Sequence, residues 1–253
     1  DALPHLERAV ALAPGRAEFH KNLGNALQAL GRPEAALEPH RRALELEPTL
    51  AEARAGFGFG LVLTGRVEEG LTELEQAVRE APRHAGIRGL AARGNARAGR
   101  TAAARGHFEA AVELDPGSAE AQNNLGTALA LAGEADRARV CFTRALQLAP
   151  GFTAARFNLA NALLSAGRWA EAAAELRVVA TDRPADPEVR ARLAGALANS
   201  GDLAGAVTAY VAALEFPAAP PEWREQYAQV LRALGRPREA LEQLLQSGEK
   251  HWM

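Results

Sequence analysis

The chain of 253 residues contains a single cysteine, Cys141, so it cannot form a disulfide bond within itself. Aromatic residues make up only 5% of it, and no apolar run reaches the length that spans a membrane. Its formal net charge is -2, which creates no field that would attract nucleic acid or an anionic membrane surface. We therefore expect a protein that neither binds nucleic acid nor inserts into a membrane.

Signatures of catalysis and of metal binding are also missing. The six histidines form no H-E-x-x-H pair, and no set of cysteine and histidine has the spacing of a zinc site. The glycines of segment 56–60 are not followed by the G-K-[ST] of a phosphate-binding loop. His20 and His40 fall on packing positions of one helix pair, which indicates a structural histidine pair satisfied by hydrogen bonds. We predict a chain that is not an enzyme and holds neither a cofactor nor a metal.

Proline and glycine, in contrast, recur with a fixed period of 34 residues. The recurring prolines are Pro14, Pro48, Pro82, Pro116, Pro150 and Pro184. The recurring glycines are Gly31, Gly65, Gly99, Gly133, Gly167, Gly201 and Gly235. A period of this length indicates stacked copies of one small structural unit. Such a stack escapes the size limit of a single core, because each unit packs only on its neighbours.

Each repeat is predicted to contain two helices joined by tight turns. In the fourth repeat, Leu125, Ala128 and Leu129 lie on one stripe of an amphipathic helix. Gly133 can then end this helix in the left-handed conformation. A second amphipathic stripe follows and stops before Pro150, which cannot continue a helix. No segment alternates with a period of two over a useful length, so we predict no strands.

The repeats are expected to form one continuous solenoid domain. Residues 1–16 are assigned to the second helix of a partial repeat. Seven consecutive repeats follow, at residues 17–50, 51–84, 85–118, 119–152, 153–186, 187–220 and 221–253.

Small residues recur where two helices must approach closely. The eighth position of the repeat holds Gly24, Gly58, Ala92, Gly126, Ala160, Ala194 and Ala228, and the twentieth position is alanine or glycine throughout. Together with the large apolar residues at positions seven and eleven and the proline at position thirty-two, this pattern resembles the tetratricopeptide repeat (TPR) family over essentially the whole chain. The resemblance implies an all-α fold, a right-handed α-solenoid of stacked antiparallel helix pairs. One departure is the fourth position, often aromatic in the family, where long polar side chains are expected to lay their stems over the core.

Two repeats look weak. Gly86, Gly89 and Gly94 fall within the first helix of the third repeat, and each costs about 1 kcal/mol relative to alanine. The second repeat also carries glycines in its first helix, and Pro39 predicts a kink in the second helix of the first repeat. Two interpretations stay open: sequence drift tolerated by well-packed neighbours, or a flexible segment near residues 56–100 that lets two rigid halves adjust around a ligand.

The first helices line the concave face of a curved stack of helix pairs. The resemblance implies that their positions 2, 5, 6, 9, 12 and 13 point into this groove. The candidate peptide-binding residues at these positions are Lys21, Asn22, Asn25, Phe59, Leu63, Arg93, Arg97, Asn123, Asn124, Thr127, Phe157, Asn158, Asn161 and Arg192.

Asparagine recurs within this set, at position six (Asn22, Asn124 and Asn158) and at position nine (Asn25 and Asn161). A carboxamide both donates and accepts hydrogen bonds, so a ladder of them can hold a peptide backbone whatever its sequence. Asparagine is a mediocre helix former. Its repeated use therefore favours this interpretation over that of a tolerated polar surface residue.

Specificity is expected from local pockets beside the asparagines. Phe59, with Val62 and Leu63, is predicted to form an open patch for an apolar side chain. Arginines at groove positions are predicted to bind carboxylates of the partner; they are Arg93, Arg97 and Arg192.

We predict a non-catalytic protein–protein interaction scaffold that binds a peptide segment of a partner in its groove. Gly56, Gly86 and Leu90 do not match the residues of the family's chaperone-tail clamp. The asparagine ladder is similar to the substrate-guiding arm of O-linked N-acetylglucosamine transferases. Two alternatives therefore remain: the substrate-recognition arm of a larger enzyme such as a glycosyltransferase, or a scaffold that self-assembles into a homo-oligomer through exposed ends. No leader peptide is visible, which favours a cytoplasmic location, and we expect a truncated N-terminus because the chain starts inside a repeat without Met.

Overall fold

The computed structural model describes residues 2–217 and 219–248, so the last residues of the seventh predicted repeat lie outside the described residues. This part of the chain contains fifteen α-helices and no strand. The chain divides into two compact units, residues 1–132 and 133–253, each considered by itself below. The division falls in the turn within the fourth predicted repeat.

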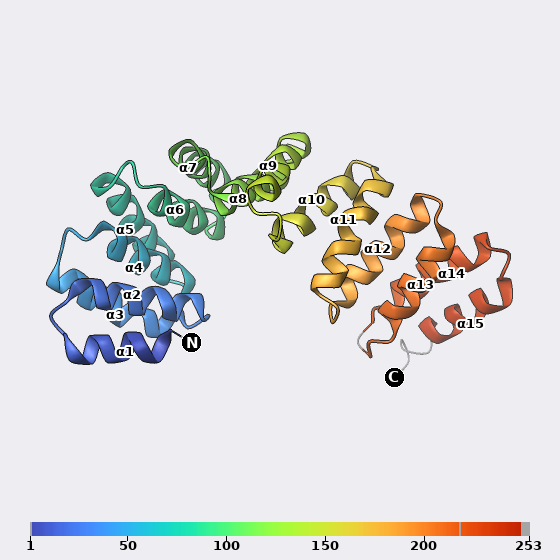
Figure 1. The fold of residues 1–253 in the computed structure, drawn as a ribbon, viewed down its shortest axis with the longest axis horizontal. Coiled ribbons are helices and arrows are strands. Elements are labelled where there is room, and N and C mark those ends of the chain that lie inside the picture. The colour runs from blue at the N-terminus through green and yellow to red at the C-terminus, as the bar shows by residue number, and fades with distance from the viewer. Residues whose placement is uncertain (1, 218, 249–253) are drawn as a thin grey trace. The chain divides into compact units, whose positions relative to one another are not determined.

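Unit 1 holds the first eight helices (Figure 1). They are α1 (Leu3–Leu12), α2 (Ala17–Ala29), α3 (Pro33–Leu46), α4 (Ala51–Leu63), α5 (Val67–Glu80), α6 (Ala85–Arg97), α7 (Thr101–Leu114) and α8 (Ala119–Leu131). Consecutive helices pack as antiparallel pairs, α2 with α3, α4 with α5 and α6 with α7, and successive pairs stack in chain order.

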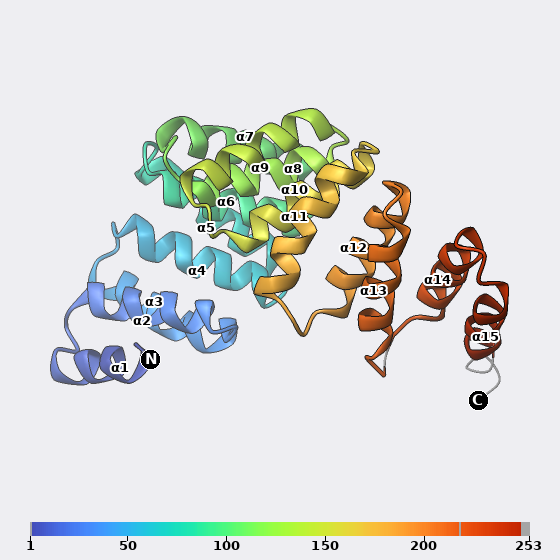
Figure 2. The ribbon, with the colours of Figure 1, turned by 45° about the vertical axis from the view of Figure 1, so that its right-hand side comes forward.

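Unit 2 continues the same arrangement with seven helices (Figure 2). They are α9 (Ala135–Leu148), α10 (Thr153–Ser165), α11 (Trp169–Asp182), α12 (Pro187–Asn199), α13 (Leu203–Leu214), α14 (Pro221–Ala233) and α15 (Pro237–Gly248). The predicted all-α repeat fold is confirmed, and each first helix begins at the predicted repeat boundary.

Glycine and proline set the helix ends as predicted. Gly31 has a φ of 71°, in the left-handed region, and its six counterparts at the same repeat position also have positive φ. The amide of Arg32 donates to the carbonyl of Leu27 at 2.9 Å, and the amide of Gly31 donates to that of Gln28 at 3.0 Å. These two bonds form a Schellman motif, which satisfies carbonyls at the end of α2. The second helix α3 ends at Leu46, two residues before the recurring proline, and it continues unbroken through the internal Pro39.

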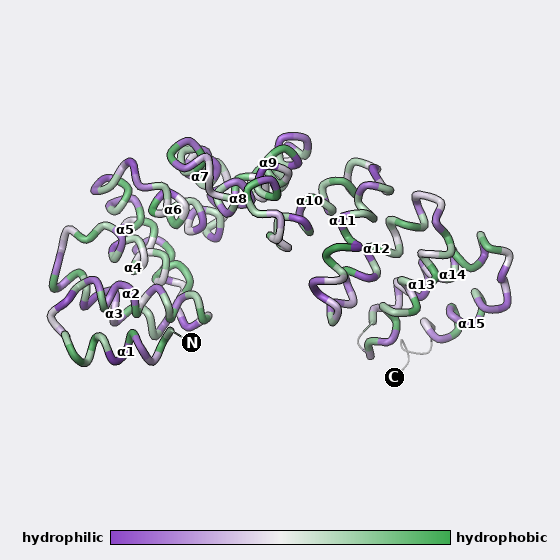
Figure 3. Tube along the Cα trace, viewed as in Figure 1, coloured by the Kyte–Doolittle hydropathy of each residue, from purple (hydrophilic) through white to green (hydrophobic). Residues whose placement is uncertain are grey.

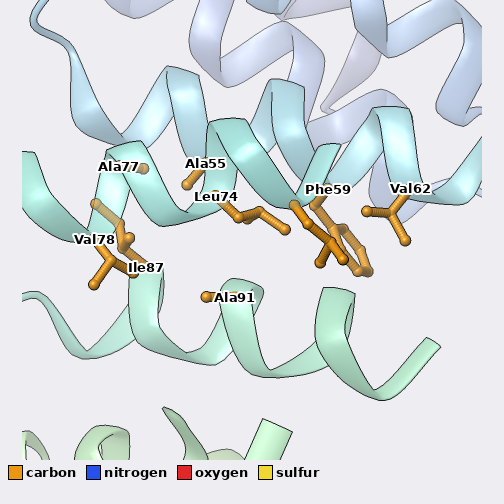
Figure 4. Packing of buried hydrophobic residues seen from close by; sticks show 9 residues of the cluster. Ala55, Phe59, Val62, Leu74, Ala77, Val78, Ile87 and Ala91 are labelled. Atoms are coloured by element: carbon orange, nitrogen blue, oxygen red, sulfur yellow. The ribbon is translucent and has the colours of Figure 1, made fainter. Parts of the chain in front are cut away.

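Hydrophobic and hydrophilic residues are interspersed along the helices (Figure 3), and each of the helices α2 to α14 buries several of its residues. In unit 1, the buried side chains of α4, α5 and α6 form one cluster that includes Phe59, Leu74 and Ile87 (Figure 4). Within the described residues, no helix is long and apolar enough to cross a membrane.

The small residues at positions eight and twenty lie where helices approach closely, as predicted. A Cβ atom added to Gly70 on α5 would lie 2.5 Å from the carbonyl oxygen of Gly58 on α4. Real Cβ contacts are essentially never this short, so the crossing of α4 and α5 requires glycine at both positions.

Candidate functional site

A pocket of about 250 Å³ lies between the first helices α6 and α8, above the second helix α7. We call it the α6–α8 pocket. Its walls include residues at repeat positions two, five, six and nine on α6 and at repeat positions two and six on α8. Phe108 and Ala111 of α7 also line it. The lining residues on α6 and α8 include Gly86, Gly89, Leu90, Arg93, Glu120 and Asn124. Groove positions of two neighbouring repeats therefore share one pocket.

The glycines of α6 keep the α6–α8 pocket open. A Cβ atom added to Gly89 would meet nothing within 4 Å, and one added to Gly86 would lie 3.2 Å from the imidazole of His84. Leu90 and Phe108 supply apolar surface, while Arg93 and Asn124 supply polar groups. The residues that make α6 look weak in sequence thus create space at its surface.

The predicted open patch at Phe59 is wrong. Phe59 is only 5% exposed and Val62 only 2%, because both side chains pack in the cluster between α4, α5 and α6. Leu63 remains partly exposed at the edge of this cluster. The guanidinium of Arg93 lies 4.5 Å from the centre of the Phe59 ring, so Phe59 supports Arg93 through a cation–π contact.

Three charged side chains at groove positions of α6 and α8 have no ion-pair partner among the residues that the structure describes. Arg97 is exposed on the last turn of α6, and Glu120 is exposed at the start of α8 on the pocket wall. Arg93 contacts the Phe59 ring but likewise no carboxylate there. These charges are available to an incoming partner without breaking an internal pair.

Lys21, in contrast, is already held by acidic side chains. Its ammonium lies 2.6 Å from Glu18 and 2.6 Å from Glu52, and its side chain is only 11% exposed. Burial acts to lower the pKa of Lys21, but the hydrogen bonds and charges of Glu18 and Glu52 outweigh it and raise the pKa. The hydrogen bond from Lys21, and a further one from His84, lower the pKa of Glu52. Lys21 therefore joins α2 to α4 and is poorly placed to grip a peptide.

The other unit 1 candidates differ in exposure. Asn22 and Asn25 are exposed on α2. On α8, Asn124 faces the α6–α8 pocket, and the exposed Thr127 donates its hydroxyl to the carbonyl of Asn123 at 3.0 Å. Asn123 is buried, with 8% of its surface exposed, which leaves little of it for a ligand.

The predicted histidine pair is only half satisfied. The Nε2 atom of His20 lies 2.9 Å from the carbonyl oxygen of Pro14. His40 is fully buried, and neither of its ring nitrogens has a hydrogen-bond partner. Its ring fits between Gly24 of α2 and Gly56 of α4, where any side chain would collide with it. Burial lowers the pKa of His40 to about 4. The predicted satisfaction of His40 is therefore wrong.

In unit 2, three predicted residues meet on α10 and α12. The guanidinium of Arg192 donates to Asn161 Oδ1 at 3.1 Å and lies 5.7 Å from the centre of the Phe157 ring. It also pairs with Glu188 at 2.6 Å. Arg192 is therefore already neutralised, and binding a partner's carboxylate would compete with Glu188. Asn158, on α10, is partly buried.

A second pocket, of about 300 Å³, lies on the first-helix face of unit 2, and we call it the tryptophan pocket. Trp169, the first residue of α11, and Trp223, the third residue of α14, both line it. Groove positions of α10, α12 and α14 form the rest of the wall, including Leu164, Glu188, Arg192, Gly195, Asn199 and Gln226. Neither tryptophan was predicted as a site residue, because positions three and seventeen do not point into the groove of the resembled family. The rarity of tryptophan, three residues in 253, was the available signal.

In the described part of the chain, no three residues of His, Cys, Asp and Glu are grouped to hold a metal ion. Burial raises the pKa of the Cys141 thiol, which disfavours the reactive thiolate. The α6–α8 pocket and the tryptophan pocket are both lined by apolar and polar side chains that can contact a ligand.

The family follows from these repeats and from direct comparison. Tetratricopeptide repeat models match residues 17–50, 62–119, 90–151, 129–194 and 224–246. The chain belongs to the tetratricopeptide repeat family. Proteins of this family generally serve as scaffolds for protein interaction and bind protein partners. A search of the curated proteins gave no match.

Solved structures support the same fold. A thermophilic TPR protein of Thermus thermophilus, TTC0263, is 29% identical, with a TM-score of 0.61 over 72% of this chain and 98% of its own. PilF of Pseudomonas aeruginosa is 18% identical, with a TM-score of 0.74 over 84% of this chain and 97% of its own. YrrB, described as a TPR protein with an unusual peptide-binding site, is 23% identical, with a TM-score of 0.51 over 71% of this chain and 93% of its own.

Proposed function

We propose that the chain is a non-catalytic interaction scaffold that binds an extended peptide segment of a partner protein on the first-helix face of its repeats. The observation that carries this proposal is the α6–α8 pocket, in which groove positions of two successive repeats meet. Its volume of about 250 Å³ is below the range of sites that enclose a drug-sized ligand. The pocket suits one side chain of a peptide that continues along the surface.

The polar groups around the α6–α8 pocket match a peptide ligand. The Asn124 carboxamide can both donate to a peptide carbonyl and accept from a peptide N–H. Arg93, held by Phe59, and Glu120 offer opposite charges on α6 and α8, and neither has a carboxylate or cation to displace within the part of the chain that the structure describes. We propose that Asn124 contributes to backbone binding and that the apolar surface of Leu90 and Phe108 receives a side chain.

A peptide selection with a matched pair of variants tests this function. A random peptide library displayed on phage is selected against the full chain, and the enriched peptides are measured by fluorescence anisotropy. Gly89→Leu fills the α6–α8 pocket from its own wall, while Gly106→Leu makes the same change on the exposed face of α7, where an added Cβ meets nothing within 4 Å.

We expect Gly89→Leu to weaken binding of the enriched peptides by about tenfold or more, and Gly106→Leu to leave it unchanged. Leucine is a better helix former than glycine, so neither variant should lose its fold. If no peptide is enriched, or if both variants bind as the parent does, peptide binding at this pocket is refuted.

A further inference from the structure

The tryptophan pocket of unit 2 is rich in hydrogen-bond donors. The indole N–H groups of Trp169 and Trp223 have no acceptor among the described residues. Both side chains are partly exposed, so these donors can reach a ligand. An indole N–H donates a hydrogen bond and cannot accept one, so the ligand must supply the acceptor.

Gln226 adds a third donor to this wall. The hydroxyl of Tyr210 donates to Gln226 Oε1 at 3.1 Å, which occupies the carboxamide oxygen and leaves its NH₂ group for a ligand. Tyr210 is only 2% exposed, and burial raises its pKa to about 12, so the hydroxyl stays protonated.

Some acceptors on the same wall are engaged within the protein. Both the Nε and the Nη2 atoms of Arg192 donate to Oε1 of Glu188, at 3.1 and 2.6 Å, while Oε2 has no partner among the described residues. The carbonyl of Gly195 accepts from the Asn199 carboxamide at 2.8 Å. A ligand with many carbonyls would therefore find three unengaged donors on this wall, while the acceptors left for N–H groups of a ligand include Glu188 Oε2 and the Asn199 carboxamide oxygen.

We propose that the tryptophan pocket binds a proline-rich segment in the polyproline II conformation. Prolines have no backbone N–H, and this helix exposes all its carbonyls to the surroundings without internal hydrogen bonds. Proline-rich segments characteristically dock in aromatic-lined grooves, where the preformed conformation lowers the entropy lost on binding. Trp169 and Trp223 supply the rings, and their indoles and Gln226 supply donors to the carbonyls.

Gly195, which has no side chain, leaves room for a ligand on the pocket wall. An added Cβ there would lie 3.8 Å from the Tyr210 hydroxyl, so glycine is not required by packing at this position. A neighbouring pocket of about 420 Å³ shares Gly195, Asn199 and Gln226, which extends the available surface along α12 and α14. An elongated peptide fits this continuation better than a compact small molecule.

This inference rests on the proposed peptide-binding function and names the ligand class for unit 2. The test uses the full chain labelled with ¹⁵N and titrated with a synthetic decaproline peptide, with the indole N–H signals followed by NMR. Trp169→Phe and Trp223→Phe each remove one signal and so assign the pair. We expect both signals to shift on titration, with saturation below about 1 mM.

The variants separate ring contact from hydrogen bonding. Trp169→Ala and Trp223→Ala should each weaken binding about tenfold or more, and the Phe variants by less, because they keep a ring but lose the donor. Val178→Ala, on the exposed part of α11 and away from the pocket, should bind as the parent does. Circular dichroism melting checks that each variant is folded, and the titration of the parent chain stands even if an alanine variant unfolds.

Unmoved indole signals at about 1 mM decaproline would overturn the inference. So would equal binding of a matched peptide of alanine and serine, which carries backbone N–H groups throughout. In either case the proposed function survives if Gly89→Leu still weakens the binding of the peptides selected on the full chain. If decaproline binds and that pocket selects nothing, peptide binding is confined to unit 2.

Discussion

The guanidinium of Arg156 donates to the carbonyl of Pro150, six residues earlier, at 2.8 Å. The same side chain pairs with Glu175 on the second helix of its own repeat at 2.6 Å. Position four repeats this arrangement, with arginine bound to the recurring proline carbonyl also at Arg54, Arg88 and Arg190. In these four repeats one arginine therefore ties the preceding turn to the body of the repeat, which explains why a polar residue replaces the aromatic often found there in the family.

We predict that Arg156→Ala lowers the stability of unit 2 by about 1–2 kcal/mol, because a carbonyl and a partly buried carboxylate both lose a charged donor. Arg156→Lys should recover only part of this loss, since lysine has no planar fork to reach both acceptors. Urea unfolding followed by circular dichroism measures the change. Arg144→Ala, at an exposed arginine that donates to Gln147 on the surface, is the control and should cost under about 0.5 kcal/mol. Equal losses for Arg156→Ala and Arg144→Ala would contradict the assignment.

Replacing glycine by alanine is expected to have opposite effects at the crossing of α4 and α5 and at an open position on α7. Gly70→Ala places a methyl group 2.5 Å from the backbone carbonyl of Gly58, and should destabilise by about 1–3 kcal/mol despite alanine's better helix propensity. Gly106→Ala on α7 meets nothing within 4 Å and should stabilise by up to about 1 kcal/mol. Thermal melting of both variants measures the pair. A raised midpoint for Gly70→Ala would contradict the close approach.

The repeat boundaries could be predicted because proline and glycine act through local backbone constraints. A proline disfavours helical geometry in the residue before it, and a glycine can adopt positive φ, wherever the rest of the chain lies. The seven glycines with positive φ and the seven first helices that begin at the predicted residues follow from this.

The candidate site was harder to predict, because exposure depends on which side chains of several helices meet. Phe59 occupies a groove position in sequence, yet α5 and α6 cover it. Lys21 and Arg192 carry the expected charges, yet Glu52 of the next first helix pairs with Lys21, and Glu188 of its own helix pairs with Arg192. Trp169 and Trp223 lie outside the family's groove positions, so only the packed structure brings them to one pocket.

The glycine-rich α6 bears on the two interpretations left open for residues 56–100. Ile87 and Ala91 of α6 are fully buried in the cluster with α4 and α5, and an added Cβ at Gly94 would lie 2.5 Å from Leu74. We predict that hydrogen exchange protects the amides of α6 about as well as those of α5, because buried contacts resist local opening. Mass spectrometry of peptides spanning both helices measures this. Fast exchange across α6 alone would favour the flexible segment instead.

His40 predicts a dependence of stability on pH in unit 1. Its unfolded-state pKa is about 6.5, and burial lowers its pKa in the folded chain to about 4. Between these values the unfolded chain binds the extra proton, so the contribution of neutral His40 is fully present above about pH 6.5 and is lost as the pH falls to about 4. The full shift corresponds to about 3 kcal/mol, of which about 2 kcal/mol is lost by about pH 5.

Urea unfolding at about pH 7 and about pH 5 measures this loss. His40→Gln keeps a polar side chain that does not titrate, so the variant should start less stable but lose about 2 kcal/mol less than the parent chain between the two conditions. His5→Gln, the same substitution at an exposed position on α1, is the matched control for replacing a histidine. If the parent and His40→Gln lose the same stability on acidification, the buried ring between Gly24 and Gly56 is not the group that senses pH.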